Sequence, residues 1–520
     1  MAVDADNKSP ATGNAAISSP PRSGFSSPLL IVALAITSAI AIWGLVDTAG
    51  LAERAAFLVH IQFTNRAWFI MLAVSFMLIV CIWLALSRYG SIRLGHDDDL
   101  PEFSTISWLT MLFAAGMGVG LLFWGTAEPL THFDLFSDYG TPGQSAGQAL
   151  FVTNFHWGLH AWAIYALTGL VIAYFGFRRD CPSLIGAPVI DTFGHNRVTA
   201  VVSWLSNLLA IVAIAIGVGG SIAMGVFQVK DGIDTLFSLS QTGATLTAAV
   251  FIVLCLSYFP ALVVDLSSGM ARLSNAAMAV AVVLMLFVLI AGPTHYIMGG
   301  LVQALGEYFG GALVHGFRTL TFMDQPIGDW FQSWTLTYMV WWIAWAPFVG
   351  VFIARISRGR TIREFIVGVI LGPTLFSILW FGIFGGAGFN HVLGDDAGIM
   401  EVVRNNVSAV TFYLLERYPL PVFTISLVIV AAFLFIVTSV VSAAFVLGMF
   451  SSNGDLNPSV KIKLSWGVIL GALGGVMILS GDIAAIKSII ALGSLPFVFV
   501  VLLLVVCLLK TLKTEIRTEA

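Results

Sequence analysis

The sequence predicts an all-α polytopic membrane protein with about twelve transmembrane helices. Of its 520 residues, 58% are hydrophobic and 10% are charged, whereas about a quarter of the residues in a soluble domain are charged. Apolar stretches of about twenty residues recur along the whole chain, and a helix of that length crosses the hydrocarbon core of a bilayer. Most of the chain is therefore expected to contact membrane lipid, and no large soluble domain fits between the apolar stretches.

The apolar stretches also predict the organisation of the chain. Residues 1–27, rich in Ser, Pro and Ala, form a predicted disordered cytoplasmic tail, and residues 28–87 hold two peripheral transmembrane helices. Residues 298–320 mix apolar and charged side chains at helical spacing, which favours a short amphipathic helix along the membrane interface. Residues 509–520 form a short cytoplasmic tail. The predicted spans are 28–48, 67–87, 106–126, 146–175, 199–228, 242–265, 271–296, 328–355, 362–385, 418–449, 460–482 and 486–508.

Charge predicts the orientation and excludes one class of partner. Most of the 24 lysines and arginines fall on one side of the membrane when the N-terminus is placed in the cytoplasm. Cytoplasmic loops carry the excess of positive charge, so both termini are expected in the cytoplasm and the protein in the inner (plasma) membrane. The net charge is −4 and no long basic run is present, so nucleic acid is not expected as a partner.

Three glycines alternate in the middle of the third predicted span, at Gly116, Gly118 and Gly120. Each glycine weakens a helix by about 1 kcal/mol relative to alanine, and freed backbone at membrane depth survives only where it lines a cavity. We therefore predict a broken helix whose carbonyls can coordinate a cation and whose amides can receive a carboxylate. Close packing of helices through small residues is the alternative use of these glycines.

Aromatic residues are concentrated in the fourth and eighth predicted spans, away from the span ends where interfacial tryptophans usually lie. The candidate cage residues are Trp157, Trp162 and Tyr165 in the fourth span and Trp341, Trp342 and Trp345 in the eighth. A quaternary ammonium or sulfonium cannot donate a hydrogen bond, but each aromatic face attracts it by about 0.5–2 kcal/mol. Several such faces around one cavity would select a methylated onium group. Trp334 and Tyr338 continue the stripe and could serve helix packing instead.

Two further patterns allow more than one interpretation. His156 and His160 stand four residues apart and could bind a metal or haem on one helix face, although packed, hydrogen-bonded histidines are the commoner case. Thr438 and Ser439 place hydroxyls in the apolar tenth span, where they could bond back to their own helix. Beside a broken helix, the same hydroxyls become candidate sodium ligands, because sodium prefers oxygen donors.

Three segments together closely resemble the betaine/choline/carnitine transporter family. They are GMGVGLLFWGTAEP at 116–129, FHWGLHAWAIY at 155–165 and SWTLTYMVWWIAWAPFVGVFIARISRGRTIREF at 333–365, and the spacing is similar over essentially the whole chain. The resemblance implies a LeuT-like fold of two inverted five-helix repeats, here 106–296 and 328–508, and a homotrimer. No cofactor is implied apart from sodium as the coupling ion.

The resemblance also implies roles for individual residues. The implied substrate site combines the six cage residues with the glycines Gly116, Gly118 and Gly120, which would hold a substrate carboxylate. Family members that carry choline typically have an aspartate at the position of Gly120, so a zwitterion is favoured here. The implied sodium site uses Ala114, Met117, Phe435, Thr438 and Ser439. A second family sodium site uses two threonines whose positions correspond to Ile214 and Val218, which offer no oxygen.

The predicted function is import of a zwitterionic methylated-onium solute, such as glycine betaine or dimethylsulfoniopropionate, coupled to sodium by alternating access. One alternative is a proton-coupled symporter of choline or a related quaternary amine. A more remote alternative is a membrane-embedded haem or metal enzyme that uses His156 and His160.

Overall fold

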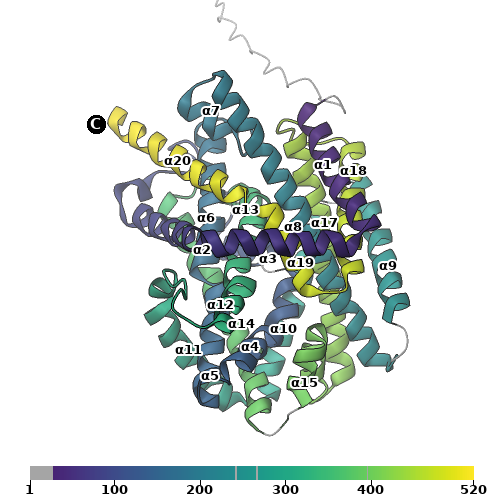
Figure 1. The fold of residues 1–520 in the computed structure, drawn as a ribbon. Helices are drawn as coiled ribbons and strands as arrows, with labels where there is room; N and C mark the ends of the chain where they lie inside the picture. The colour runs from purple at the N-terminus through teal and green to yellow at the C-terminus, as the bar shows by residue number, and fades with distance from the viewer. Residues whose placement is uncertain are drawn as a thin grey trace, which may run out of the picture.

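The computed structural model describes residues 27–116, 118–239, 243–264, 267–394, 396 and 398–519, and within these ranges the chain is helical without a named strand (Figure 1). Apart from Ser27, the predicted N-terminal tail lies outside the described residues. The helices of the first half are α1 (Pro28–Val46), α2 (Thr48–Leu86), α3 (Thr105–Gly116), α4 (Val119–Phe136), α5 (Pro142–Trp157), α6 (Leu159–Ala173), α7 (Ala187–Phe193), α8 (Arg197–Phe237), α9 (Gly243–Val263) and α10 (Ser267–Ala291).

The second half of the chain also consists of long apolar helices joined by short ones. These helices are α11 (Thr294–His315), α12 (Gln325–Phe331), α13 (Thr337–Arg355), α14 (Ile362–Leu393), α15 (Gly398–Asn405), α16 (Val410–Leu415), α17 (Pro421–Ser451), α18 (Val460–Ser480), α19 (Ile483–Ser494) and α20 (Phe497–Glu519). A π-helical turn at Gln332–Leu336 joins α12 to α13.

Twelve helical segments in the described residues are long and apolar enough to cross a membrane, as the sequence predicts. Two details differ from the prediction. The third predicted span, 106–126, is divided between α3 and α4, so neither part qualifies alone. The helix α11 is long and apolar enough to cross a membrane, although the sequence favours an interfacial helix at 298–320. The placement of α11 relative to a membrane stays a prediction.

The predicted twelfth span, 486–508, is wrong as a single helix. Leu495 and Pro496 separate α19 from α20. Proline has no amide hydrogen and disfavours the α conformation of the residue before it, which favours a helix break at this point. The predicted tail, 509–520, continues α20 as a helix to Glu519, and its place in the cytoplasm stays a prediction.

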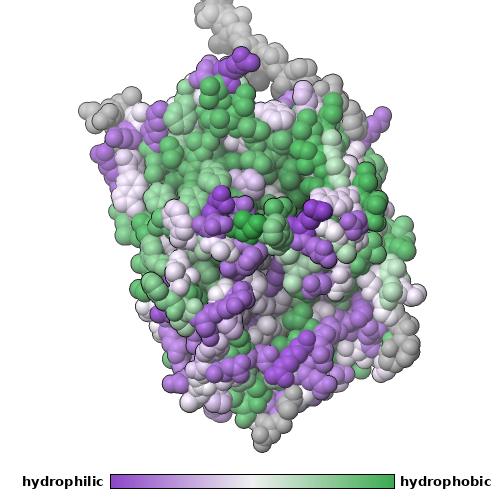
Figure 2. Space-filling model, in the orientation of Figure 1, coloured by the Kyte–Doolittle hydropathy of each residue, from purple (hydrophilic) through white to green (hydrophobic). Residues whose placement is uncertain are grey.

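The start of α1 and the end of α20 lie at the same end of the molecule in Figure 1. A chain that crosses a membrane an even number of times has both of its ends on the same side. On the face drawn in Figure 2, apolar residues dominate the upper half, and polar residues gather over the lower half, where α5, α11 and α15 lie. The long helices thus present an apolar surface, as lipid contact requires.

Polar side chains begin several helices by accepting their first free amides. Asn196 accepts from the amides of Val198 and Thr199 at the start of α8, and Asp482 caps α19 in the same way. Thr361 and Glu364 form a reciprocal capping box at the start of α14. Each cap satisfies amides that have no partner inside the helix, so these residues fix where the three helices begin.

The two predicted repeats each open on an irregular helix. The first, 106–296, begins with the interrupted pair α3 and α4, and the second, 328–508, begins with the π-helical turn before α13. Helix α13 packs against α6, and α17 packs against α8, so elements of both halves meet in the interior. Irregular helices at corresponding places of two halves are typical of a transporter binding site. The inverted relation of the halves stays a prediction.

Candidate functional site

The predicted helix break is present at the glycine stretch. Helix α3 ends at Gly116 and α4 begins at Val119, while Gly118 is extended, with φ −81° and ψ −150°. Gly118, Val119 and Gly120 line one cavity, so the first turn of α4, whose amides have no partner inside the helix, forms part of its wall. A Cβ on Gly120 would lie 3.1 Å from Cη2 of Trp157, so any larger residue here would require this indole to shift by a few tenths of an ångström.

A second break, at Gly158, was not predicted. The sequence predicts one helix over 146–175, but α5 ends at Trp157 and α6 begins at Leu159. The cause is Tyr308 of α11, whose hydroxyl accepts from the amide of Leu159 at 2.7 Å and occupies the space that a Cβ on Gly158 would need. The break leaves the carbonyl of His156 free to accept from the Trp342 indole N–H at 2.8 Å.

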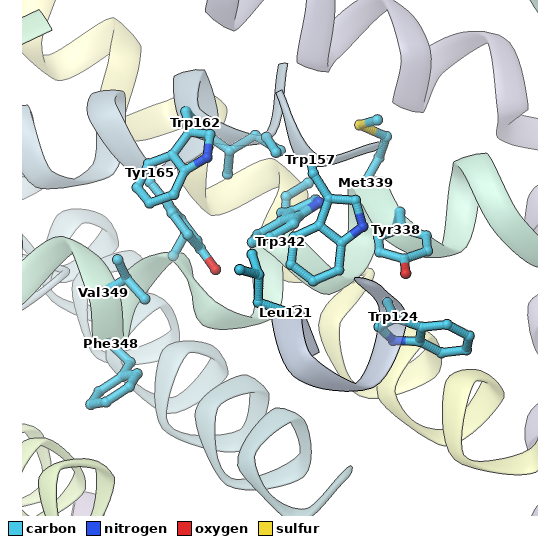
Figure 3. Close-up of a cluster of buried hydrophobic side chains, with 14 of the residues drawn as sticks. Leu121, Trp124, Trp157, Trp162, Tyr165, Tyr338, Met339, Trp342, Phe348 and Val349 are labelled. Atoms are coloured by element: carbon cyan, nitrogen blue, oxygen red, sulfur yellow. The ribbon is translucent and has the colours of Figure 1, made fainter. Parts of the chain in front are cut away.

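The aromatic residues of α5, α6 and α13 meet around this cavity, which we call the aromatic cage. The ring centroids of Trp157 and Trp342 lie 5.2 Å apart with an interplanar angle of 83°, and those of Tyr165 and Trp342 lie 5.3 Å apart at 80° (Figure 3). The cage is lined by Trp124, Trp157, Tyr165, Tyr338, Trp341, Trp342 and Trp345, together with Gly118 and Gly120. Faces of several rings thus surround a space large enough for a small solute.

One predicted cage residue is placed elsewhere, and two cage walls were not predicted. Trp162 does not line the cavity; its ring packs edge-on behind Tyr165, with the centroids 5.5 Å apart (Figure 3). The break at Gly158 shifts the helical phase between Trp157 and Trp162, which removes Trp162 from the shared face. Trp124 and Tyr338 do line the cavity. Tyr338 was a packing candidate in the sequence, and its position in the aromatic stripe was the available signal.

Glu128 of α4 organises one side of the aromatic cage. Its Oε2 accepts from the Trp157 indole N–H at 2.8 Å and from the Tyr338 hydroxyl. Its Oε1 lies 2.8 Å from Nδ1 of His156 and 3.4 Å from Nε2 of His132, and all three side chains are fully buried. A carboxylate in this position is surrounded by donors, which is the condition under which a buried charge is tolerated.

The histidine tautomers follow from the remaining partners. The Trp330 indole N–H donates to Nδ1 of His132 at 3.0 Å, and an indole nitrogen can only donate. A neutral His132 therefore carries its proton on Nε2, which faces Glu128. Nε2 of His156 lies 3.0 Å from the Thr335 hydroxyl, which leaves Nδ1 to donate to Glu128. Glu128, His132 and His156 thus form a hydrogen-bonded relay in which each N–H described above has an acceptor.

The histidine pair of the enzyme hypothesis does not form a shared site. Ligand atoms of Glu128, His132 and His156 lie within 4.8 Å of one another, a spacing that could hold a metal, but those atoms already bond to each other. His160 is not part of this group: its ring packs on Phe155 with the centroids 4.7 Å apart. The alternative in which His156 and His160 share one metal or haem therefore has no support from these contacts.

Of the implied sodium residues, Ser439 lies beside the break between α3 and α4. Ser439 of α17 lines the cage together with Gly118, and a Cβ on Gly118 would lie 3.9 Å from the Ser439 hydroxyl oxygen. The Thr438 hydroxyl donates to the carbonyl of Phe435 at 3.1 Å. Met117 lies outside the described residues. Ala114 belongs to α3, which ends at this break.

The second family sodium site has no oxygen in this chain. Ile214 and Val218 of α8 are both buried, and Val218 contributes an apolar side chain to the cage wall. The only side-chain oxygen that α8 contributes to the cavity lining is that of Ser221.

Residues 28–517 of the chain match the family described as betaine/carnitine/choline family transporter. The chain belongs to this family. The match covers every described helix up to the last turn of α20, so the betaine/carnitine/choline transporter fold accounts for the whole helical bundle. The family consists of transporters, which makes this chain a multi-pass membrane transporter and not an enzyme.

Individual relatives of this betaine/carnitine/choline family transporter are similar over nearly their full length. The glycine betaine transporter OpuD of Bacillus subtilis is 39% identical over 489 residues, which cover 94% of each chain. A probable glycine betaine transporter of Desulfitobacterium hafniense is 35% identical over 492 residues, 94% of this chain and 97% of the relative. The ectoine/hydroxyectoine transporter of Virgibacillus pantothenticus is 33% identical over 471 residues, 89% of this chain and 92% of the relative.

Proposed function

We propose that this transporter imports a small zwitterionic solute with a methylated onium group, with glycine betaine as the first choice and dimethylsulfoniopropionate as a second. The aromatic cage is the observation that carries this proposal. Trp157, Tyr165 and Trp342 present faces or edges around one buried space, and a trimethylammonium group is attracted to such rings without needing a hydrogen-bond acceptor.

The zwitterion is favoured by the backbone beside the cage. The first turn of α4 brings free amides and the positive end of a helix dipole to Gly118 and Gly120, where a carboxylate is stabilised. The position of Gly120 offers no anionic side chain to balance a solute that is only a cation. Two of the relatives named above are glycine betaine transporters and one is an ectoine transporter, and these solutes are zwitterions.

Sodium is the coupling ion in this proposal. The Ser439 hydroxyl lies beside the break between α3 and α4, and the family resemblance adds the Thr438 hydroxyl and the carbonyl of Phe435; oxygen donors of this kind are hard ligands suited to sodium. The absence of oxygen at Ile214 and Val218 favours a single sodium site. We further propose a plasma-membrane homotrimer with both termini in the cytoplasm, on the basis of the family resemblance and the charge distribution.

Proton coupling is the second candidate, and the relay around Glu128 favours it. Glu128, His132 and His156 form a buried protonatable group whose donors include the cage residues Trp157 and Tyr338. A proton taken up there would change the electrostatic potential at the cage directly. Under this alternative the solute is choline or a related quaternary amine.

Uptake into liposomes that contain the purified transporter separates the two coupling ions. An inward sodium gradient at equal pH is expected to drive accumulation of radiolabelled glycine betaine, and an inward proton gradient without sodium is not. Thr438→Val removes a proposed sodium ligand, so the sodium concentration for half-maximal uptake is expected to rise about tenfold, the effect of about 1.4 kcal/mol.

The matched control for this experiment is Thr424→Val on the same helix. Thr424 is also buried, and its hydroxyl, like that of Thr438, donates to backbone carbonyls one turn earlier, but it lies in the first turn of α17 and is not part of the implied sodium set. The sodium dependence of uptake by the Thr424→Val transporter is expected to equal that of the wild type. Uptake that follows the proton gradient in the absence of sodium would contradict sodium coupling and support the relay as the coupling site.

A further inference from the structure

Lys487 is a buried lysine that the site described so far does not use. It belongs to α19, and only 7% of its surface is exposed. Its ammonium nitrogen lies 3.2 Å from the ring centroid of Trp334, 5.1 Å from that of Trp124 and 5.9 Å from that of Tyr338. Three aromatic residues therefore surround a cation that the protein itself supplies.

The ammonium lies between the aromatic cage and a second, larger cavity, which we call the open cavity. The open cavity has a volume of about 1170 Å³, is lined by Lys487, Trp334 and Trp124, and reaches the exposed residues His60 and Asp329. Trp124 lines both cavities, and Tyr338 lines the cage. Lys487 therefore places a positive charge at the rim of the cage that faces the open cavity.

Of the acidic side chains in this region, Asp329 lines the open cavity at an exposed position, whereas Glu128 and Asp482 are engaged elsewhere. No hydrogen-bond acceptor or ion-pair partner within contact distance of the Lys487 ammonium is found in the described part of the chain. The buried carboxylate of Glu128 is turned toward the cage, where Trp157, Tyr338 and His156 donate to it. Asp482 accepts from the first amides of α19.

A purely structural role does not explain a lysine here. A buried ammonium without an acceptor is costly, whereas an apolar side chain of the same length would pack on Trp334 and Trp124 without that cost. Such a charge is retained where it acts on something that arrives from outside, and the open cavity is the space from which the cage rim can be reached.

We propose that Lys487 determines which onium solutes the transporter accepts, by excluding those with a net positive charge. A solute that is only a cation, such as choline, is repelled at the cage rim, whereas a zwitterion has no net charge and carries a carboxylate that the ammonium attracts. The inference rests on the proposed function, since it concerns the charge of the same class of solute.

The test compares Lys487→Met with the wild type for two solutes that share a trimethylammonium head. Binding of glycine betaine and of choline is measured on the purified transporter by isothermal titration. K487M is expected to strengthen choline binding about tenfold or more relative to glycine betaine, because the repulsion is removed. Damage to the cage would weaken the binding of both solutes alike. The ratio of their dissociation constants therefore isolates the charge effect.

Three further variants make the result unambiguous. Lys487→Arg keeps the charge and is expected to keep the wild-type ratio, and Lys487→Gln is expected to reproduce K487M if the methionine variant does not fold. Lys461→Met, the same substitution at an exposed lysine of α18, is expected to leave the ratio unchanged. An unchanged ratio in K487M and K487Q would overturn this inference alone. A wild-type protein that binds no glycine betaine would overturn the proposed function and this inference together.

Discussion

Glu128 shows how one buried carboxylate can arrange an aromatic site. Two of its donors, Trp157 and Tyr338, are also walls of the cage, so the carboxylate fixes the rings that would face the solute. Donation from the Trp157 indole N–H to an anion also increases the electron density of that ring, which strengthens its attraction for a cation. Glu128 is thus a positioning residue that acts through the rings and has no need to touch the solute.

Replacing this carboxylate by an amide should weaken solute binding. In Glu128→Gln one acceptor oxygen becomes an NH₂ group that faces donors, so at least one buried donor loses its partner, at a cost of about 1–3 kcal/mol. We expect the dissociation constant for glycine betaine to rise about tenfold or more, measured by titration of the purified protein.

The control for this change lies one and a half turns further along α4. Asp134 forms an ion pair with Arg404, whose side chain is 63% exposed, and exposed pairs contribute little. Asp134→Asn should therefore leave the affinity unchanged. A folded E128Q protein with wild-type affinity would show that Glu128 does not position the cage.

The residue scale also shows where sequence patterns stop being informative. Helical spacing placed Trp157 and Tyr165 on one face, the family resemblance added Trp342, and in the structure the rings of Trp157 and Tyr165 both contact that of Trp342. Glu128 and Lys487 were not predicted, because a single charged residue has no period that reveals its partners. The available signal was the presence of ionisable residues in apolar stretches, since such residues are rare and functional at membrane depth.

At the scale of helices, the interruptions have causes of different range. The break before α4 follows from three local glycines and could be predicted from the sequence. The break at Gly158 depends on Tyr308, whose hydroxyl accepts from the amide of Leu159. These two residues lie 149 positions apart in the chain, so no local sequence pattern contains the contact. Its consequence is the displacement of Trp162 from the cage, so an unpredicted break explains the incorrect cage assignment.

The arginine-rich connection between α13 and α14 holds two parts of the chain together. Arg360 is buried, with 3% of its surface exposed; its guanidinium lies 4.1 Å from the ring centroid of Trp108 and donates to the carbonyl of Phe103 at 2.9 Å. The Trp108 indole in turn donates to the Ser357 hydroxyl at 2.9 Å. These contacts attach the connection to the start of α3.

Removing this guanidinium should destabilise the transporter. Arg360→Gln loses the stacking on Trp108 and the charge-assisted bond to Phe103, together about 2 kcal/mol, so the thermal unfolding temperature of the detergent-purified protein should fall by several degrees. Arg358→Gln is the matched control: its side chain is 50% exposed and pairs with Asp99 on the surface, which contributes little. Equal unfolding temperatures for R360Q and R358Q would contradict a stabilising role for Arg360.

For the whole molecule, the helical architecture was predictable because a membrane allows few solutions. Apolar segments long enough to span a bilayer must satisfy their backbone internally, so twelve helices follow from composition and length alone. The inverted relation of the two halves and the trimer rest on family resemblance. The relative positions of α4, α13 and α19, which bring Glu128 and Lys487 to the same aromatic cluster, depend on tertiary packing and required the structure.

The central claim is that the aromatic cage binds a methylated zwitterion, and titration of the purified transporter with glycine betaine while monitoring tryptophan fluorescence tests it most directly. The account predicts a saturable change in fluorescence for the wild type, no saturable change with glycine, which lacks the methyl groups, and a much weaker affinity in Trp342→Leu, because that variant removes a cage wall. The absence of any saturable response to glycine betaine or to a sulfonium zwitterion, or an unchanged affinity in W342L, would contradict it.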